Sequence, residues 1–136
     1  MGARASLLVV PAGLMALGLA ACEAAPVPGR AGPGTVEYLG IATRLLDDNL
    51  VSLRVALRNP RDRDQIDAYA RCAAAQYALI RGFGFARHVR TNLAERDGIW
   101  QADAVYTVSS SLPRGPLTLD AEVVVDNCTQ EGIPTV

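Results

Sequence analysis

An apolar run near the N-terminus, from Leu7 to Ala20, follows a short segment that carries one basic side chain, Arg4. This is the layout of an export signal. At a rise of about 1.5 Å per residue the run spans only about 21 Å, less than the roughly 30 Å hydrocarbon core of a bilayer. The run therefore predicts a removable signal peptide, and the residues behind it must build the folded part of the chain.

The run ends in Leu19-Ala20-Ala21-Cys22, which resembles the lipobox of bacterial lipoproteins. The resemblance implies cleavage before Cys22 and lipidation of its thiol, so that acyl chains hold the protein on a membrane without a spanning segment. It also implies a periplasm-facing location in the bacterial cell envelope. Glu23 is not the aspartate associated with inner-membrane retention, which favours the outer membrane. The alternative is an ordinary secretory signal cut near Ala21 or Ala24.

These features divide the chain into a signal peptide at 1–21, a lipidated cysteine with a flexible tether at 22–34, and one domain at 35–136. Proline and glycine dominate the tether, which leaves it little to bury. Twelve extended residues reach at most about 40 Å. The remaining length suits one domain and is too short for two.

The chain has three cysteines, an odd number for an exported protein. If Cys22 carries lipid, Cys72 and Cys128 remain, and an oxidising compartment would favour a disulfide between them. Two buried thiols are the alternative. With one histidine and no Cys-x-x-Cys pattern, we expect no metal site and no cofactor.

Two strands are predicted first. Val36 to Leu46 is apolar, and Leu50 to Arg58 alternates apolar and polar residues, which is typical of a half-buried strand. The turn residues Asp47-Asp48-Asn49 lie between them. The two segments therefore predict a hairpin.

A helix should follow, capped by Asp62 or Asp64 and running to about Arg81, with Gly82 ending it. Its apolar residues recur at spacings of three and four, as one stripe facing a sheet. These residues are Ile66, Tyr69, Ala70, Ala73, Tyr77 and Ile80.

Three further strands are predicted at Phe83 to Leu93, Ile99 to Ser109 and Leu117 to Asp126, with a hairpin turn at Asp97-Gly98. The fold class is then α+β, with one helix packed on a mostly antiparallel sheet in the order β-β-α-β-β-β. In this arrangement Cys128, just past the last strand, would be joined to Cys72 on the helix.

No catalytic constellation is recognisable in the sequence. Charge is nearly balanced over the expected mature chain, with twelve arginines and 14 acidic residues, so we expect no nucleic-acid partner. The lone histidine, His88, lies between Arg87 and Arg90 and is interpreted as a solvated strand residue. These three residues form a candidate docking face for an acidic partner or for lipid headgroups, with a salt-bridged sheet surface as the alternative.

Together these observations favour a membrane-anchored, non-enzymatic accessory or binding domain that contacts another envelope protein. The alternative is a small-ligand-binding protein or minor hydrolase with a pocket between helix and sheet. A polar cleft around His88 would support that alternative.

Overall fold

The computed structural model describes Gly2 and residues 34–136. The expected signal peptide, the lipobox with Cys22, and the tether up to Pro33 lie outside the described residues. The described elements are, in chain order, β1 (Glu37–Asp47), β2 (Leu50–Arg58), α1 (Arg63–Ile80), β3 (Phe85–Arg96), β4 (Ile99–Ser109), β5 (Thr118–Asp120) and α2 (Ala121–Glu131). Within this part of the chain, no helix is both long enough and apolar enough to cross a membrane.

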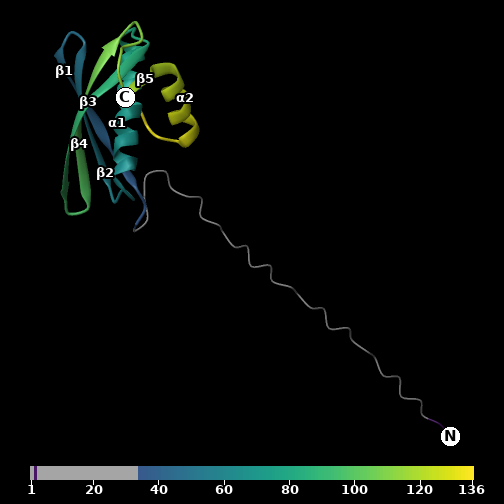
Figure 1. The fold of residues 1–136 in the computed structure, drawn as a ribbon. Helices are drawn as coiled ribbons and strands as arrows, with labels where there is room; N and C mark the ends of the chain where they lie inside the picture. Colours follow the sequence, from purple (N-terminus) through teal and green to yellow (C-terminus); the bar gives the residue numbers. More distant parts are fainter. Residues whose placement is uncertain (1, 3–33) are drawn as a thin grey trace. The chain divides into compact units, whose positions relative to one another are not determined.

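The five strands form one antiparallel sheet with the spatial order β1-β2-β4-β3-β5. Two hairpins build most of it, β1 with β2 and β3 with β4, and α1 connects them (Figure 1). The predicted α+β class and the antiparallel sheet are confirmed.

The alternation in β2 has the predicted structural consequence. Val51, Leu53, Val55 and Leu57 are all fully buried against the helix side of the sheet, where they form the centre of the core. The hairpin turn between β3 and β4 is also confirmed. Asp97 and Gly98 have φ values of 53° and 76°, which suits a two-residue turn with both central residues left-handed.

Helix α1 begins and ends where the sequence predicts. The Asp62 carboxylate accepts a hydrogen bond from the backbone N–H of Gln65 at 3.0 Å, and Gly82 follows the helix with a φ of 82°. Small alanine side chains on more than one side of α1 allow other elements to pack close to its backbone. Ala73 and Ala74 are fully buried, and so is Ala75, which lies one turn beyond Cys72.

The predicted last strand is wrong. Only Thr118–Asp120 joins the sheet, and residues from Ala121 onward form the helix α2, so the order along the chain is β-β-α-β-β-β-α. The segment satisfies both periodicities, because Ala121, Val124, Val125 and Cys128 also recur at helical spacing. The ends decide the outcome: the Asp120 carboxylate accepts from the backbone N–H of Val123, and Gly132 takes the left-handed conformation at the C-terminus of the helix.

The predicted disulfide between Cys72 and Cys128 is present, with the two Cα atoms 6.0 Å apart. It joins α1 to α2 and not the helix to a strand end, because the segment that carries Cys128 is helical. Helix α2 packs against α1, and both cysteines are almost fully buried. The bond therefore fixes the second helix onto the first.

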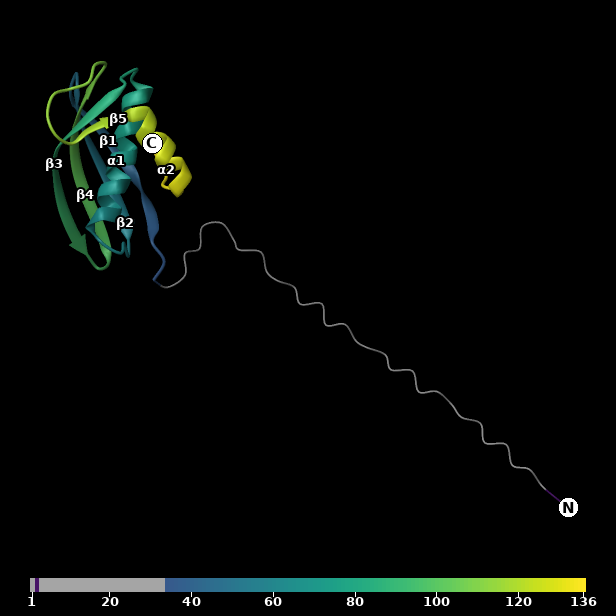
Figure 2. The same cartoon turned by 45° about the vertical axis from the view of Figure 1, so that its right-hand side comes forward.

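Both helices lie on the same side of the sheet (Figures 1 and 2). The opposite side, which we call the open face, is covered by neither helix. Its residues are the register partners that alternate with the core positions of β2 and β4, including Ser52, Arg54, Asp103 and Val105. The molecule thus offers two distinct surfaces: the helix-to-sheet boundary and the open face.

Candidate functional site

A bulge in β3 brings two polar side chains to the helix side of the sheet. His88 pairs with Tyr106 and Thr91 pairs with Ala104, while the register shifts between His88 and Arg90, which leaves Val89 as the extra residue. Tyr106 and Ala104 both belong to the buried side of β4. His88 and Thr91 therefore share that side, and a ring nitrogen of His88 lies 2.7 Å from the Thr91 hydroxyl in a hydrogen bond.

An open pocket surrounds this pair, between α1 and the β3–β5 edge of the sheet, with a volume of about 280 Å³. Its lining residues come from the helix, three strands and the loop before β5. They are Arg63, Asp67, Arg71, His88, Thr91, Tyr106, Leu117 and Leu119. A cleft around the lone histidine is therefore present, with several polar groups in a lining that is mostly apolar.

Helix α1 supplies the charged rim of the pocket. Arg63, Asp67 and Arg71 are spaced four residues apart, which aligns them along one edge of the helix. The Arg63 Nε lies 3.3 Å from a carboxylate oxygen of Asp67 in an exposed ion pair. Arg71 has no ion pair among the described residues, so the rim carries one guanidinium that a ligand can engage.

Tyr106 and His88 form the aromatic wall of the pocket. Their rings meet edge to face with centroids 5.2 Å apart, and Tyr106 is only 4 % exposed. Burial raises the pKa of the Tyr106 hydroxyl to about 12, an effect that the positive charge of Arg71 partly opposes. At neutral pH this wall therefore presents an uncharged phenol.

Leu117 and Leu119 supply the apolar wall. Leu117 adopts an unusual left-handed conformation with a φ of 62°, and its carbonyl accepts a hydrogen bond from the backbone N–H of His88 at 3.1 Å. Its side chain stays 64 % exposed. The loop is thus held against β3 in a conformation that leaves an apolar side chain facing outward beside the polar pair.

The pocket brings together hydrogen-bonding groups, a cation and apolar side chains. No carboxylate forms an ion pair with His88 within residues 34–136. The same part of the chain contains no cluster of three side chains suited to hold a metal ion. A guanidinium, an imidazole and two hydroxyls beside leucine side chains are groups that can hold a small anionic molecule with an apolar portion.

The structure separates the three residues of the predicted docking face. Arg87 pairs with Thr107 and Arg90 pairs with Val105, so both lie on the open face, whereas His88 lies on the helix side. His88 is half-buried in the pocket and is not the solvated strand residue that the sequence suggested. The bulge at Val89 keeps Arg90 on the same side as Arg87.

Most of the pocket residues were missed in the sequence. In the sequence Tyr106 does not differ from the core side chains that share its side of the strand at 99–109. Arg71 and Asp67 were not singled out at all. Their four-residue spacing with Arg63 is the signal that could have found them, because it places all three on one edge of the helix.

Comparison with known proteins places these elements in one family. The family model described as the YNQ4 C-terminal domain matches residues 38–132. The chain belongs to the YNQ4 C-terminal domain family. The matched region of this family runs from β1 to the end of α2, so it includes both disulfide cysteines and the whole pocket, while Cys22 precedes it.

One relative of this YNQ4 C-terminal domain is a protein of Paracoccus denitrificans, named as an uncharacterized 26.9 kDa protein in the nqo8 5' region. The two are 36% identical over 87 residues, which is 64% of this chain and 34% of the relative. The chain thus matches about a third of the length of that relative. No solved structure matches the chain.

Proposed function

We propose that this chain is a lipid-anchored protein of the bacterial envelope, facing the periplasm, in which the folded domain acts as a non-enzymatic accessory or binding module. The observation that carries the proposal is the state of the cysteines. Cys72 and Cys128 are bonded to each other, so neither is available to pair with Cys22. Cys22, the remaining cysteine of the three, stands at the lipobox position behind the apolar run. A disulfide also suits an exported protein.

The pocket around His88 supports a second, narrower candidate, in which the domain binds a small ligand. Convergent polar groups beside an apolar wall are typical of ligand sites. Arg71 would meet an anionic group and Leu117 an apolar one, with His88 and Thr91 supplying hydrogen bonds between them. The accessory role and ligand binding are compatible, since a bound molecule can be what the module senses or presents.

The anchor is tested by mass spectrometry of the protein extracted from membranes. A mature N-terminus at Cys22 with the added mass of acyl chains is expected, and the Cys22→Ala variant should remain unprocessed. A mature protein that begins elsewhere and carries no lipid would contradict the anchor. Cross-linking of the native and Cys22→Ala proteins in the envelope then identifies contacts that depend on it.

The pocket is tested separately by native mass spectrometry of the purified full chain, followed by titration with any small molecule that is retained. Arg71→Ala should weaken retention about tenfold or more, as expected for loss of a charge-assisted hydrogen bond. Arg81→Ala, which removes a charge elsewhere on the exposed end of the same helix, should leave it unchanged. Equal retention by both variants would exclude Arg71 from the site.

A further inference from the structure

Three arginines from three different strands gather on the open face. Arg44 of β1 pairs with Ser52 of β2, Ser52 with Val105 of β4, and Val105 with Arg90 of β3, so these four residues form one row across the sheet. Arg54 lies two residues along β2 from Ser52. With strands about 4.8 Å apart, the backbone positions of Arg44 and Arg90 are about 14 Å apart.

These three arginines form no ion pair with the described residues. The ion pairs of the described residues are Arg58 with Glu37 and Arg63 with Asp67, and neither involves the row. Asp103 is the register partner of Arg54, yet its carboxylate accepts a hydrogen bond from the Ser52 hydroxyl at 2.6 Å and forms no ion pair with Arg54. Three exposed arginines thus remain available on the open face.

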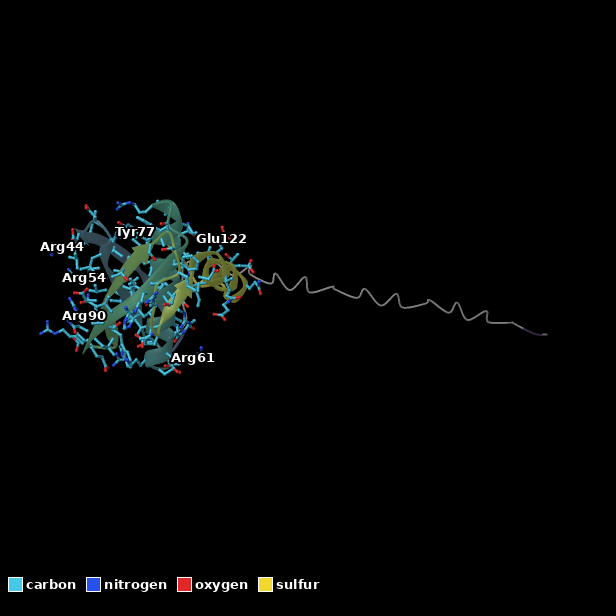
Figure 3. All side chains as sticks on the ribbon, turned by 45° about the horizontal axis from the view of Figure 1, so that its top comes forward. Arg44, Arg54, Arg61, Tyr77, Arg90 and Glu122 are labelled. Atoms are coloured by element: carbon cyan, nitrogen blue, oxygen red, sulfur yellow. A yellow bond between two sulfur atoms is a disulfide. The ribbon has the colours of Figure 1, made fainter. Side chains whose placement is uncertain are left out.

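The charge of the domain is distributed unequally between its two sides. Helix α2, on the far side of α1 from the sheet, carries Glu122, Asp126 and Glu131 and no basic residue. Figure 3 shows Arg44, Arg54 and Arg90 on one side of the molecule and Glu122 on the opposite side. An anionic surface would therefore attract the open face and repel α2, which fixes one orientation.

We propose that the open face docks onto anionic phospholipid headgroups, with Arg44, Arg54 and Arg90 contacting their phosphates. Guanidinium groups bind phosphate in a bidentate manner, and charges spread over about 14 Å match a layer of phosphates better than one small anion. The inference rests on the proposed lipid anchor in one respect: a tether of at most about 40 Å would hold the face close to such a surface.

The test uses the full chain extracted from membranes and reconstituted into vesicles of phosphatidylcholine, with or without phosphatidylglycerol. Energy transfer from Trp100, the single tryptophan, to a dansyl-labelled headgroup reports how closely the domain approaches the bilayer. Transfer should be higher in the anionic vesicles and should fall when salt is added, because exposed charges are screened.

Two matched double variants decide the role of the arginines. Arg44→Gln with Arg90→Gln removes both ends of the row, and the ratio of docked to undocked protein should fall about 30-fold. Arg61→Gln with Arg81→Gln removes the same charge from residues flanking α1 and should behave as the native chain. Equal transfer in the two kinds of vesicle, or equal loss in both variants, would overturn the proposal and point to a protein partner or to none.

The experiments distinguish a failure of the proposed lipid anchor from a failure of the proposed docking face. If mass spectrometry finds no lipid on Cys22, the anchor is wrong, and salt-sensitive co-sedimentation of the unlipidated chain with anionic vesicles still tests the face. If the lipid is present and transfer does not depend on phosphatidylglycerol, the anchor stands and the docking face is wrong.

Discussion

His88 and Thr91 are three residues apart on one strand and yet face the same side of the sheet, 2.7 Å apart. The bulge at Val89 makes this pairing possible, since residues three apart on a regular strand face opposite sides. The bulge, more than any motif, defines the pocket.

Replacing Thr91 by Val should release the imidazole from its hydrogen bond and lower the free energy of unfolding by about 1 kcal/mol. The ring-nitrogen chemical shifts of His88 should change as well. Urea unfolding and nitrogen-15 NMR of the imidazole measure both effects. Thr107→Val, on the open face of β4, is the matched control, and identical shifts in the native and Thr91→Val proteins would contradict the hydrogen bond.

Tyr106 should make the domain less stable in strong alkali. Its pKa is 10.0 in the unfolded chain and about 12 in the folded one, so the folded state holds the proton more tightly. That stabilisation is fully present below pH 10 and decreases as the pH rises toward 12, by up to about 3 kcal/mol. Denaturant unfolding at several alkaline pH values measures the slope.

Tyr106→Phe should flatten this alkaline dependence, because it removes the buried hydroxyl. A residual slope is expected in Tyr106→Phe, because burial also raises the pKa of Tyr69. An unchanged slope in Tyr106→Phe would show that the phenol is not buried as described.

Reduction of the Cys72–Cys128 disulfide should lower the melting temperature substantially. The bond closes a loop with a sequence separation of 56 residues, for which the chain-entropy model gives about 4 kcal/mol. Differential scanning calorimetry with and without dithiothreitol measures the effect. The double variant Cys72→Ala with Cys128→Ala should have a low melting temperature that does not change when dithiothreitol is added. If the melting temperature of the native domain also does not change on reduction, the disulfide is contradicted.

Gly98→Ala should destabilise the β3–β4 hairpin. Gly98 has a φ of 76°, and an added Cβ would lie 2.9 Å from the Asn59 side-chain oxygen. A left-handed backbone costs a residue with a Cβ about 1–2 kcal/mol, which urea unfolding should detect. Gly84→Ala, where no neighbour lies within 4 Å and φ is not positive, is the control.

Asp120→Ala should destabilise the second helix by about 1 kcal/mol, because its carboxylate caps α2. Hydrogen exchange of the amides of the first turn of α2 should accelerate. Asp126→Ala removes an exposed charge in the middle of the same helix and should leave that first turn unchanged. Equal exchange in both variants would favour the extended conformation first predicted for this segment.

The fold was predictable wherever a single periodicity accounted for the pattern. The alternation in β2, the glycine after α1 and the Asp97-Gly98 turn each have one structural interpretation, and all three are confirmed. The sequence offers Asp62 or Asp64 as the cap of α1, and in the structure Asp62 caps it. The segment from Ala121 to Cys128 has two structural interpretations, a strand and a helix. Its strand and helix patterns compete, and only the caps at Asp120 and Gly132, together with an alanine-lined side on α1, favour the helix.

The pocket was less predictable, for a topological reason. Its charged rim comes from α1, its aromatic wall from β3 and β4, and its apolar wall from β5 and the loop before it. No sequence window contains these groups together. A bulge leaves little signal in a single sequence, so the shared side of His88 and Thr91, and the separation of His88 from Arg87, required the three-dimensional register.

The bulges have a further consequence at the edges of the sheet. Edge strand β1 has register shifts next to Tyr38 and next to Asp47. At the other edge β5 pairs only with Phe85–Arg87, so the rest of β3 forms that edge, with a bulge at Val89 and charged residues at Arg90, Glu95 and Arg96. Irregular or charged edges offer a poor template for pairing with another chain. Copies of this domain at high concentration should therefore resist strand-to-strand aggregation, even though no helix covers one side of their sheet.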